Sequence, residues 1–83
     1  MTIINEQILV EHIAVSREVC HGQPRIAGTR IMVHLVLELL GAGKSIAEIV
    51  SEDYYPDLTP DDVLACIVYA GQVVKNELII PTA

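Results

Sequence analysis

The sequence predicts a mainly α-helical protein, a bundle of three short helices preceded by a short β-strand or hairpin arm. Three observations carry this prediction. Apolar residues recur at helical spacing from Val33, capping signals open two further helices, and glycine and proline interrupt the stretch before Val33. With 83 residues, the chain can bury one hydrophobic core. We therefore expect one domain, with an extended arm (1–32), a three-helix core (33–75) and an apolar C-terminal tail (76–83).

The arm is expected to hold one strand followed by turns. Residues 8–15 are densely apolar, interrupted only by Glu11 and His12, which favours a single short strand. Residues 20–30 contain two glycines and a proline, so the backbone must reverse there at least once. Extended pieces at residues 25–27 and 30–31 could form a small hairpin.

The first two helices are predicted from periodicity and capping. The first helix is indicated by apolar residues at positions i, i+3, i+4 and i+7, namely Val33, Val36, Leu37 and Leu40. Gly41 and Gly43 end it. Ser45 and Glu48 have the spacing of a capping box, so a second helix begins there, and we expect it to end near Asp53.

The third helix has the clearest start. Thr59 is a typical N-cap, and Pro60 is tolerated at the first helical position because its missing N–H would have no helical partner there. The aspartates at 61–62 complement the positive end of the helix dipole. Leu58 and Val63 are spaced as a hydrophobic staple.

The third helix also has too much apolar surface for so small a bundle. From 63 to 74 only Gln72 is plainly polar, and a helix that is apolar all round is normally buried all round. We expect part of it to be covered by another subunit or a partner, with the arm folding back over it as the alternative. The tail could add as a strand to a partner or pair with residues 8–15. The candidate interface residues are Leu64, Val68, Tyr69 and Val73 on the helix and Leu78, Ile79 and Ile80 in the tail.

Charge is distributed unevenly along the chain. The formal net charge is -6, which argues against a broad basic footprint for nucleic acid. Residues 17–44 hold Arg17, Arg25, Arg30 and Lys44 against two acids, whereas residues 45–83 hold seven acids against Lys75. The second half is therefore strongly acidic.

No catalytic, cofactor or metal-binding pattern is recognisable. The histidines lack ligand spacing, the glycine-rich stretch lacks a phosphate-loop lysine, and two cysteines form neither a disulfide framework nor a zinc pair. Nothing in the sequence favours an enzyme. No apolar run approaches the length of a membrane span, and the N-terminus lacks the basic start of a signal peptide, so we expect a cytoplasmic protein.

A longer motif resembles a known family. Its most specific part contains Gly22, Pro24, Gly28, Thr29 and Arg30, and it continues through Gly43 and residues 45–49 to residues 55–59. Over residues 8–74 the chain resembles the small bacterial family called domain of unknown function 433. The resemblance implies a homeodomain-like, helix-turn-helix-like fold and a role as an antitoxin encoded beside a ribonuclease toxin of the PIN type. Met32 and His21 depart from the frequent proline and glycine of the family.

Candidate nucleic-acid contacts follow from the remaining cations. Arg25 lies beside Pro24 in an arm that we expect to be exposed, and homeodomain arms contact the minor groove or phosphates. Arg30 could contact phosphate, or it could pair with Asp53 or Asp57 and pin the arm to the turn before the third helix. Lys44 is the third candidate contact.

Three functions are compatible with the sequence. The first is a homodimeric antitoxin that neutralises a PIN-type ribonuclease and could bind its own promoter. The second is a free-standing regulator that uses residues 45–53 and 59–74 as a helix-turn-helix, although the aspartates at 61–62 would repel phosphate and the turn is long. The third is a dimeric interaction module without nucleic-acid contact.

Overall fold

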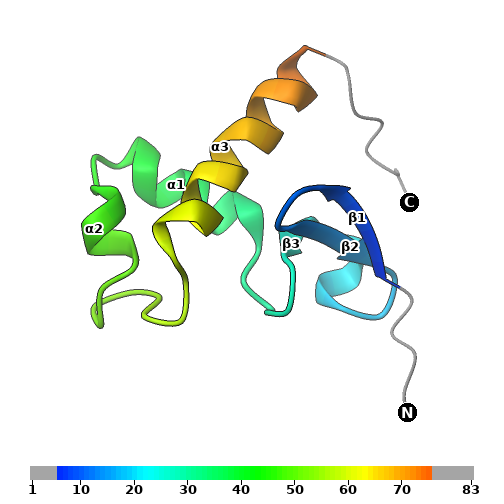
Figure 1. Cartoon of the computed structure of the whole chain (residues 1–83), viewed down its shortest axis with the longest axis horizontal. Coiled ribbons are helices and arrows are strands. Elements are labelled where there is room, and N and C mark those ends of the chain that lie inside the picture. The colour runs from blue at the N-terminus through cyan, green and yellow to red at the C-terminus, as the bar shows by residue number, and fades with distance from the viewer. Residues whose placement is uncertain (1–5, 76–83) are drawn as a thin grey trace.

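A computed structural model describes residues 6–75 (Figure 1). Three helices follow a small antiparallel sheet, which confirms the mainly helical prediction. The predicted tail, residues 76–83, lies outside the described residues. In chain order the elements are β1 (Glu6–Val10), β2 (Ile13–Ser16), the 3-10 turn η1 (Cys20–Gly22), β3 (Arg25–Ile26), α1 (Val33–Gly41), α2 (Ile46–Ile49) and α3 (Pro60–Val74).

The arm forms a three-stranded antiparallel sheet in the order β1-β2-β3. The prediction of one strand over residues 8–15 is wrong, because the chain reverses at Glu11 and His12 and returns as β2. His12 adopts a φ of 71°, the left-handed conformation that this tight reversal needs. The small hairpin expected from residues 25–27 and 30–31 does form, since Ile26 N–H donates to the Ile31 carbonyl at 2.9 Å.

The starts of all three helices match the sequence prediction. α1 begins at Val33, and Ser45 and Thr59 each complete a capping box, with Glu48 and Asp62 respectively. The predicted end of α2 near Asp53 is wrong, because the helix ends at Ile49. The Ser51 hydroxyl donates to the Glu48 carbonyl at 2.6 Å and accepts from Asp53 N–H at 3.2 Å, so a side-chain turn replaces the last helical turn.

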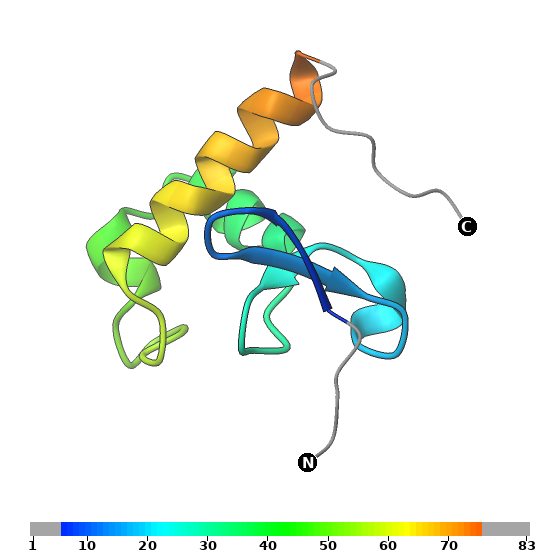
Figure 2. The same cartoon turned by 45° about the vertical axis from the view of Figure 1, so that its right-hand side comes forward.

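The core lies where the three helices and β2 and β3 meet (Figure 2). The predicted staple residues Leu58 and Val63 are both buried in it. α1 contacts α3, and α3 also contacts β2, so the sheet is packed against the helices rather than extended into solvent. The buried apolar cluster consists of Ile13, Ile26, Val33, Val36, Ile49, Leu58, Val63, Ala65, Cys66 and Tyr69.

Candidate interaction site on the third helix

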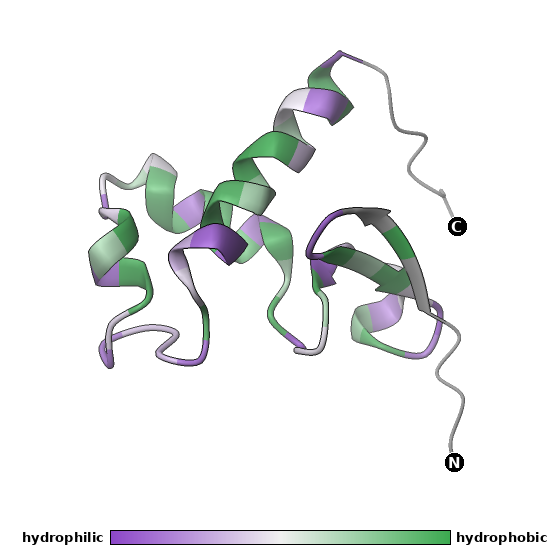
Figure 3. Cartoon of the chain, viewed as in Figure 1, coloured by the Kyte–Doolittle hydropathy of each residue, from purple (hydrophilic) through white to green (hydrophobic). Residues whose placement is uncertain are grey.

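The helix α3 has an inner and an outer face. Successive helical residues are rotated by about 100°, and Val63, Cys66 and Tyr69 lie on the inner face in the core. On the opposite side Leu64, Ile67 and Val68 are between 44% and 54% exposed. Together with Gly71 these residues form what we call the outer face of α3. Figure 3 shows hydrophobic colour along much of this helix. The described residues thus leave an apolar stripe uncovered.

Only some of the predicted interface residues lie on the outer face. Leu64 and Val68 are exposed on it. Tyr69 is wrong as an interface residue, because it is 4% exposed and packs in the core, and Val73 also packs partly buried against the core. Both point toward α1, since they lie on the inner side of the helix. The tail residues Leu78, Ile79 and Ile80 lie outside the described residues.

The alternative, in which the arm covers α3, is realised along one edge of the helix. At the turn between β1 and β2, His12 Nδ1 lies 2.9 Å from Asp62 Oδ1 in the first turn of α3. Ala65 is buried on this side, next to His12. Asp61 and Val68 of α3 line the same hollow with Glu11, and beyond it Ile8 of β1 remains 54% exposed.

An apolar groove separates α1 from the C-terminal half of α3. Burial raises the pKa of the Tyr69 hydroxyl, which lies in the groove wall. This hydroxyl has no hydrogen-bond partner within the part of the chain that the structure describes. The groove is lined by Gln23, Pro24, Val33, His34, Leu37, Tyr69, Ala70, Val73 and Val74.

A second candidate surface is acidic. We call Glu48, Glu52, Asp53 and Asp57 the acidic surface; all four are exposed, and they lie on α2 and on the connection from α2 to α3. The Ser45 backbone N–H, followed by the Ser45 hydroxyl contact, lowers the pKa of Glu48. Residues 45–74 contain neither lysine nor arginine. The segment itself thus supplies no balancing positive charge, and Lys44 just before it adds a further lowering to the pKa of Glu48.

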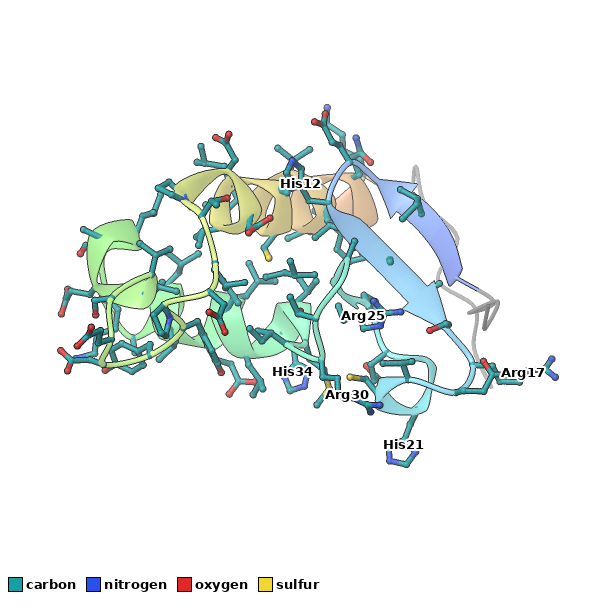
Figure 4. All side chains as sticks on the ribbon, turned by 60° about the horizontal axis from the view of Figure 1, so that its bottom comes forward. His12, Arg17, His21, Arg25, Arg30 and His34 are labelled. Atoms are coloured by element: carbon teal, nitrogen blue, oxygen red, sulfur yellow. The ribbon has the colours of Figure 1, made fainter. Side chains whose placement is uncertain are left out.

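The three predicted nucleic-acid residues do not form one surface. The expectation that Arg25 is exposed is wrong, because it is 2% exposed, and its Nη2 donates to Ser16 Oγ at 2.8 Å (Figure 4). Arg25 is buried because β3 pairs with β2, where Arg25 lies opposite Ala14. Lys44 is half-buried, with its Nζ 6.0 Å from the centre of the Tyr54 ring.

Arg30 is exposed beside η1, where its carbonyl accepts from Cys20 Sγ at 3.3 Å. Within residues 6–75 it forms no ion pair with Asp53 or Asp57, so the arm is not pinned as the sequence suggested. Arg17 and His21 are not among the predicted contacts, yet both are exposed, Arg17 just before η1 and His21 within it (Figure 4).

Comparison with family models identifies the family of the chain. The model described as a protein of unknown function, DUF433, matches residues 13–70, well over half of the sequence. The chain belongs to the DUF433 family. Comparisons with curated proteins and with solved structures gave no match.

The residues of the DUF433 motif build the turn that leads into α1. Gly22 and Gly28 have φ values of 78° and 80°, which favour glycine. Thr29 Oγ1 donates to the Ile26 carbonyl at 2.7 Å and accepts from Ile31 N–H at 3.0 Å. The Pro24 carbonyl accepts from Val33 N–H at 3.0 Å. In this chain the motif therefore has a structural role, apart from the exposed Arg30.

The structure adds two further observations about the DUF433 chain. No group of three or more metal-ligating side chains occurs among residues 6–75. In the same described range, no helix has the length and apolar character needed to cross a membrane.

Proposed function

We propose that this DUF433 chain is the antitoxin of a bacterial type II toxin–antitoxin pair and neutralises a ribonuclease toxin of the PIN type by binding it in the cytoplasm. The family resemblance supports this role. The observation that carries it is the acidic surface, four exposed carboxylates in a segment without lysine or arginine. The activity is binding rather than catalysis.

The acidic surface suits the chemistry of a ribonuclease. A protein that binds RNA presents lysine and arginine to the phosphates, so its substrate cleft is positively charged. A rigid acidic partner is attracted to such a cleft and competes with RNA for it. Glu48 is held in place by the capping box of α2, and Asp53 N–H is fixed by Ser51, so the carboxylates are presented from ordered backbone.

Binding to its own promoter is a secondary part of the proposal. The helix order supports a homeodomain-like arrangement, but Arg25 is buried. Promoter contact would therefore fall to Arg30 and Lys44. A free-standing helix-turn-helix regulator has less support, because α2 has four residues, the connection spans residues 50–59, and α3 opens with two aspartates.

The function is tested by titrating the purified chain against the PIN-type ribonuclease encoded beside it while RNA cleavage is followed. We expect complete inhibition at stoichiometric amounts, weakening as salt is raised. A double charge reversal, Glu52→Lys with Asp53→Lys, should weaken inhibition at least about tenfold.

The matched control is Glu11→Lys with Glu18→Lys, the same change at two exposed acids of the arm. It should inhibit like the parent chain. A ribonuclease that cleaves RNA undisturbed at excess of the parent chain would overturn the proposal. A stable complex without inhibition would favour the interaction module instead.

A further inference from the structure

The outer face of α3 contains a glycine, Gly71, that the packing of residues 6–75 does not require. Gly71 lies inside the helix and has ordinary helical φ, since it is not among the residues with positive φ. A Cβ added to it would meet no atom of the described residues within 4 Å. Glycine is poorly suited to a helix interior, and elsewhere such a glycine allows another backbone to approach closely. Within residues 6–75, Gly71 has no such neighbour.

Opposite charges lie at the two ends of the same face. Asp61 is exposed in the first turn of α3, and Lys75 is the exposed C-cap residue, whose backbone still follows the helical path. Fourteen residues of helix bring the two positions to within about 40° of each other around the axis. Neither side chain forms an ion pair within residues 6–75.

We propose that two copies of this chain pair through the outer faces of α3, antiparallel, about a two-fold axis between Ile67 and Val68. In this register Leu64 of one copy meets the partner subunit's Gly71, where the missing side chain leaves room for it. Val68, close to the axis, meets the partner subunit's Val68, and Ile67 flanks this contact. Asp61 lies opposite the partner subunit's Lys75, and the symmetry repeats each contact.

The partner is a second copy because the face is complementary to itself. Leu64 and Gly71 lie on either side of the middle of the helix, so a large side chain faces a position without one. Asp61 and Lys75 are arranged in the same way, with opposite charges. A two-fold interface requires such an arrangement. In a parallel pair, Asp61 would lie beside the partner subunit's Asp61, and the two carboxylates would repel each other. The pairing does not depend on the proposed function. It leaves the acidic surface free, because that surface lies on α2 and the following connection.

The charge pairs are tested by sedimentation equilibrium of the full chain over a range of concentrations. The parent chain should form dimers. Asp61→Lys and Lys75→Asp should each weaken dimerisation at least about tenfold, because each creates like charges at two places. The double variant, Asp61→Lys with Lys75→Asp, should recover most of the loss. Asp57→Lys, an exposed acid outside the outer face, is the control and should dimerise like the parent.

Recovery in the double variant separates pairing from helix stability. Reversing both charges places lysine at the positive end of the α3 dipole and aspartate at the negative end, so the isolated helix is destabilised more than in either single variant. If the double variant dimerises no better than the single variants, the register is wrong. A parent chain that stays monomeric at all concentrations overturns the proposal.

The antiparallel direction of the two α3 helices is tested with introduced cysteines in a Cys20→Ser background. In the antiparallel pair, Val68→Cys lies close to the axis and should form a disulfide-linked dimer under mild oxidation. Two copies of Leu64→Cys would be displaced along the axis by about 10 Å, beyond disulfide reach, and should stay uncoupled. Efficient coupling through position 64, or none through position 68, would contradict the antiparallel arrangement.

Discussion

Asp62 and His12 join the two halves of the molecule, although fifty residues separate them in sequence. His12 Nδ1 at the turn between β1 and β2 lies 2.9 Å from Asp62 Oδ1 in the first turn of α3. The other oxygen of the same carboxylate accepts from Thr59 N–H at 2.9 Å and completes the cap of α3. One side chain thus stabilises the start of α3 and fixes the sheet against it.

This carboxylate predicts a specific dependence of stability on pH. Burial raises the pKa of Asp62, but hydrogen bonds from Thr59 and His12 outweigh it and hold the pKa below its ordinary value of 3.8. A carboxyl with a lowered folded pKa contributes stability that is present above its unfolded pKa and is lost as pH falls toward the folded value. Asp62→Asn should therefore lose less stability than the parent in acid below about pH 4.

At neutral pH the same variant should be about 1 kcal/mol less stable, a typical value for a weakened cap. Urea unfolding at a series of pH values measures both effects. Asp57→Asn is the control, because this exposed acid lies outside the outer face of α3 and makes no side-chain hydrogen bond within residues 6–75. Parallel pH profiles of the Asp62→Asn variant and the parent would contradict the assigned role.

His21 should be a site where glycine stabilises the fold. It occupies the left-handed region, with φ 55° and ψ 33°, which costs other residues energy that glycine avoids. We expect His21→Gly to raise the free energy of unfolding by about 0.5 to 1 kcal/mol. His34→Gly makes the same change on the exposed side of α1 and should lower it by about 1 kcal/mol. Thermal unfolding of both compares them, and equal destabilisation would contradict the prediction.

The two thiols should differ sharply in reactivity. Cys66 is fully buried, and burial together with the Asp62 charge raises its pKa to about 11. Cys20 is half-buried. A thiol reagent at pH about 8 should therefore modify one site quickly in the native protein and the second only on unfolding. Cys20→Ser should remove the fast phase, and rapid modification of both sites in the parent would be the contrary result.

Gly71 and Gly43 should respond oppositely to alanine. Gly71→Ala should raise the stability of the dilute, monomeric chain by about 0.5 to 1 kcal/mol, because the added methyl group meets open space and alanine favours the helix. Gly43 has a φ of 93°, so Gly43→Ala should lower stability by about 1 kcal/mol. Urea unfolding distinguishes them. A destabilised Gly71→Ala monomer would mean that the glycine serves its own chain.

Helix starts could be predicted from sequence because the residues that cap them act locally. Ser45 and Glu48, or Thr59 and Pro60, satisfy backbone groups within one turn, so their spacing carries the information. The reversal at His12 could not be predicted, since a non-glycine residue with positive φ leaves no clear signal. In the sequence alone, Glu11 and His12 indicate only a polar interruption of one strand.

The interface prediction failed where it depended on tertiary packing. Arg25 is beside a proline and two turns, which is typical of an exposed loop, yet the pairing of β3 with β2 buries it beside Ser16. Along α3 the sequence is apolar on every side, so it could not distinguish Tyr69, which faces the core, from Val68, which faces solvent. Only the position of α1 decides between them.

The most direct test of the central claim is the mass of the full chain in solution, measured by light scattering on a sizing column, alone and with the adjacent PIN-type ribonuclease. We predict a dimer alone and, with the ribonuclease, a larger complex of fixed stoichiometry that no longer cleaves RNA. If the two proteins elute separately and the ribonuclease stays fully active, this chain is not its antitoxin.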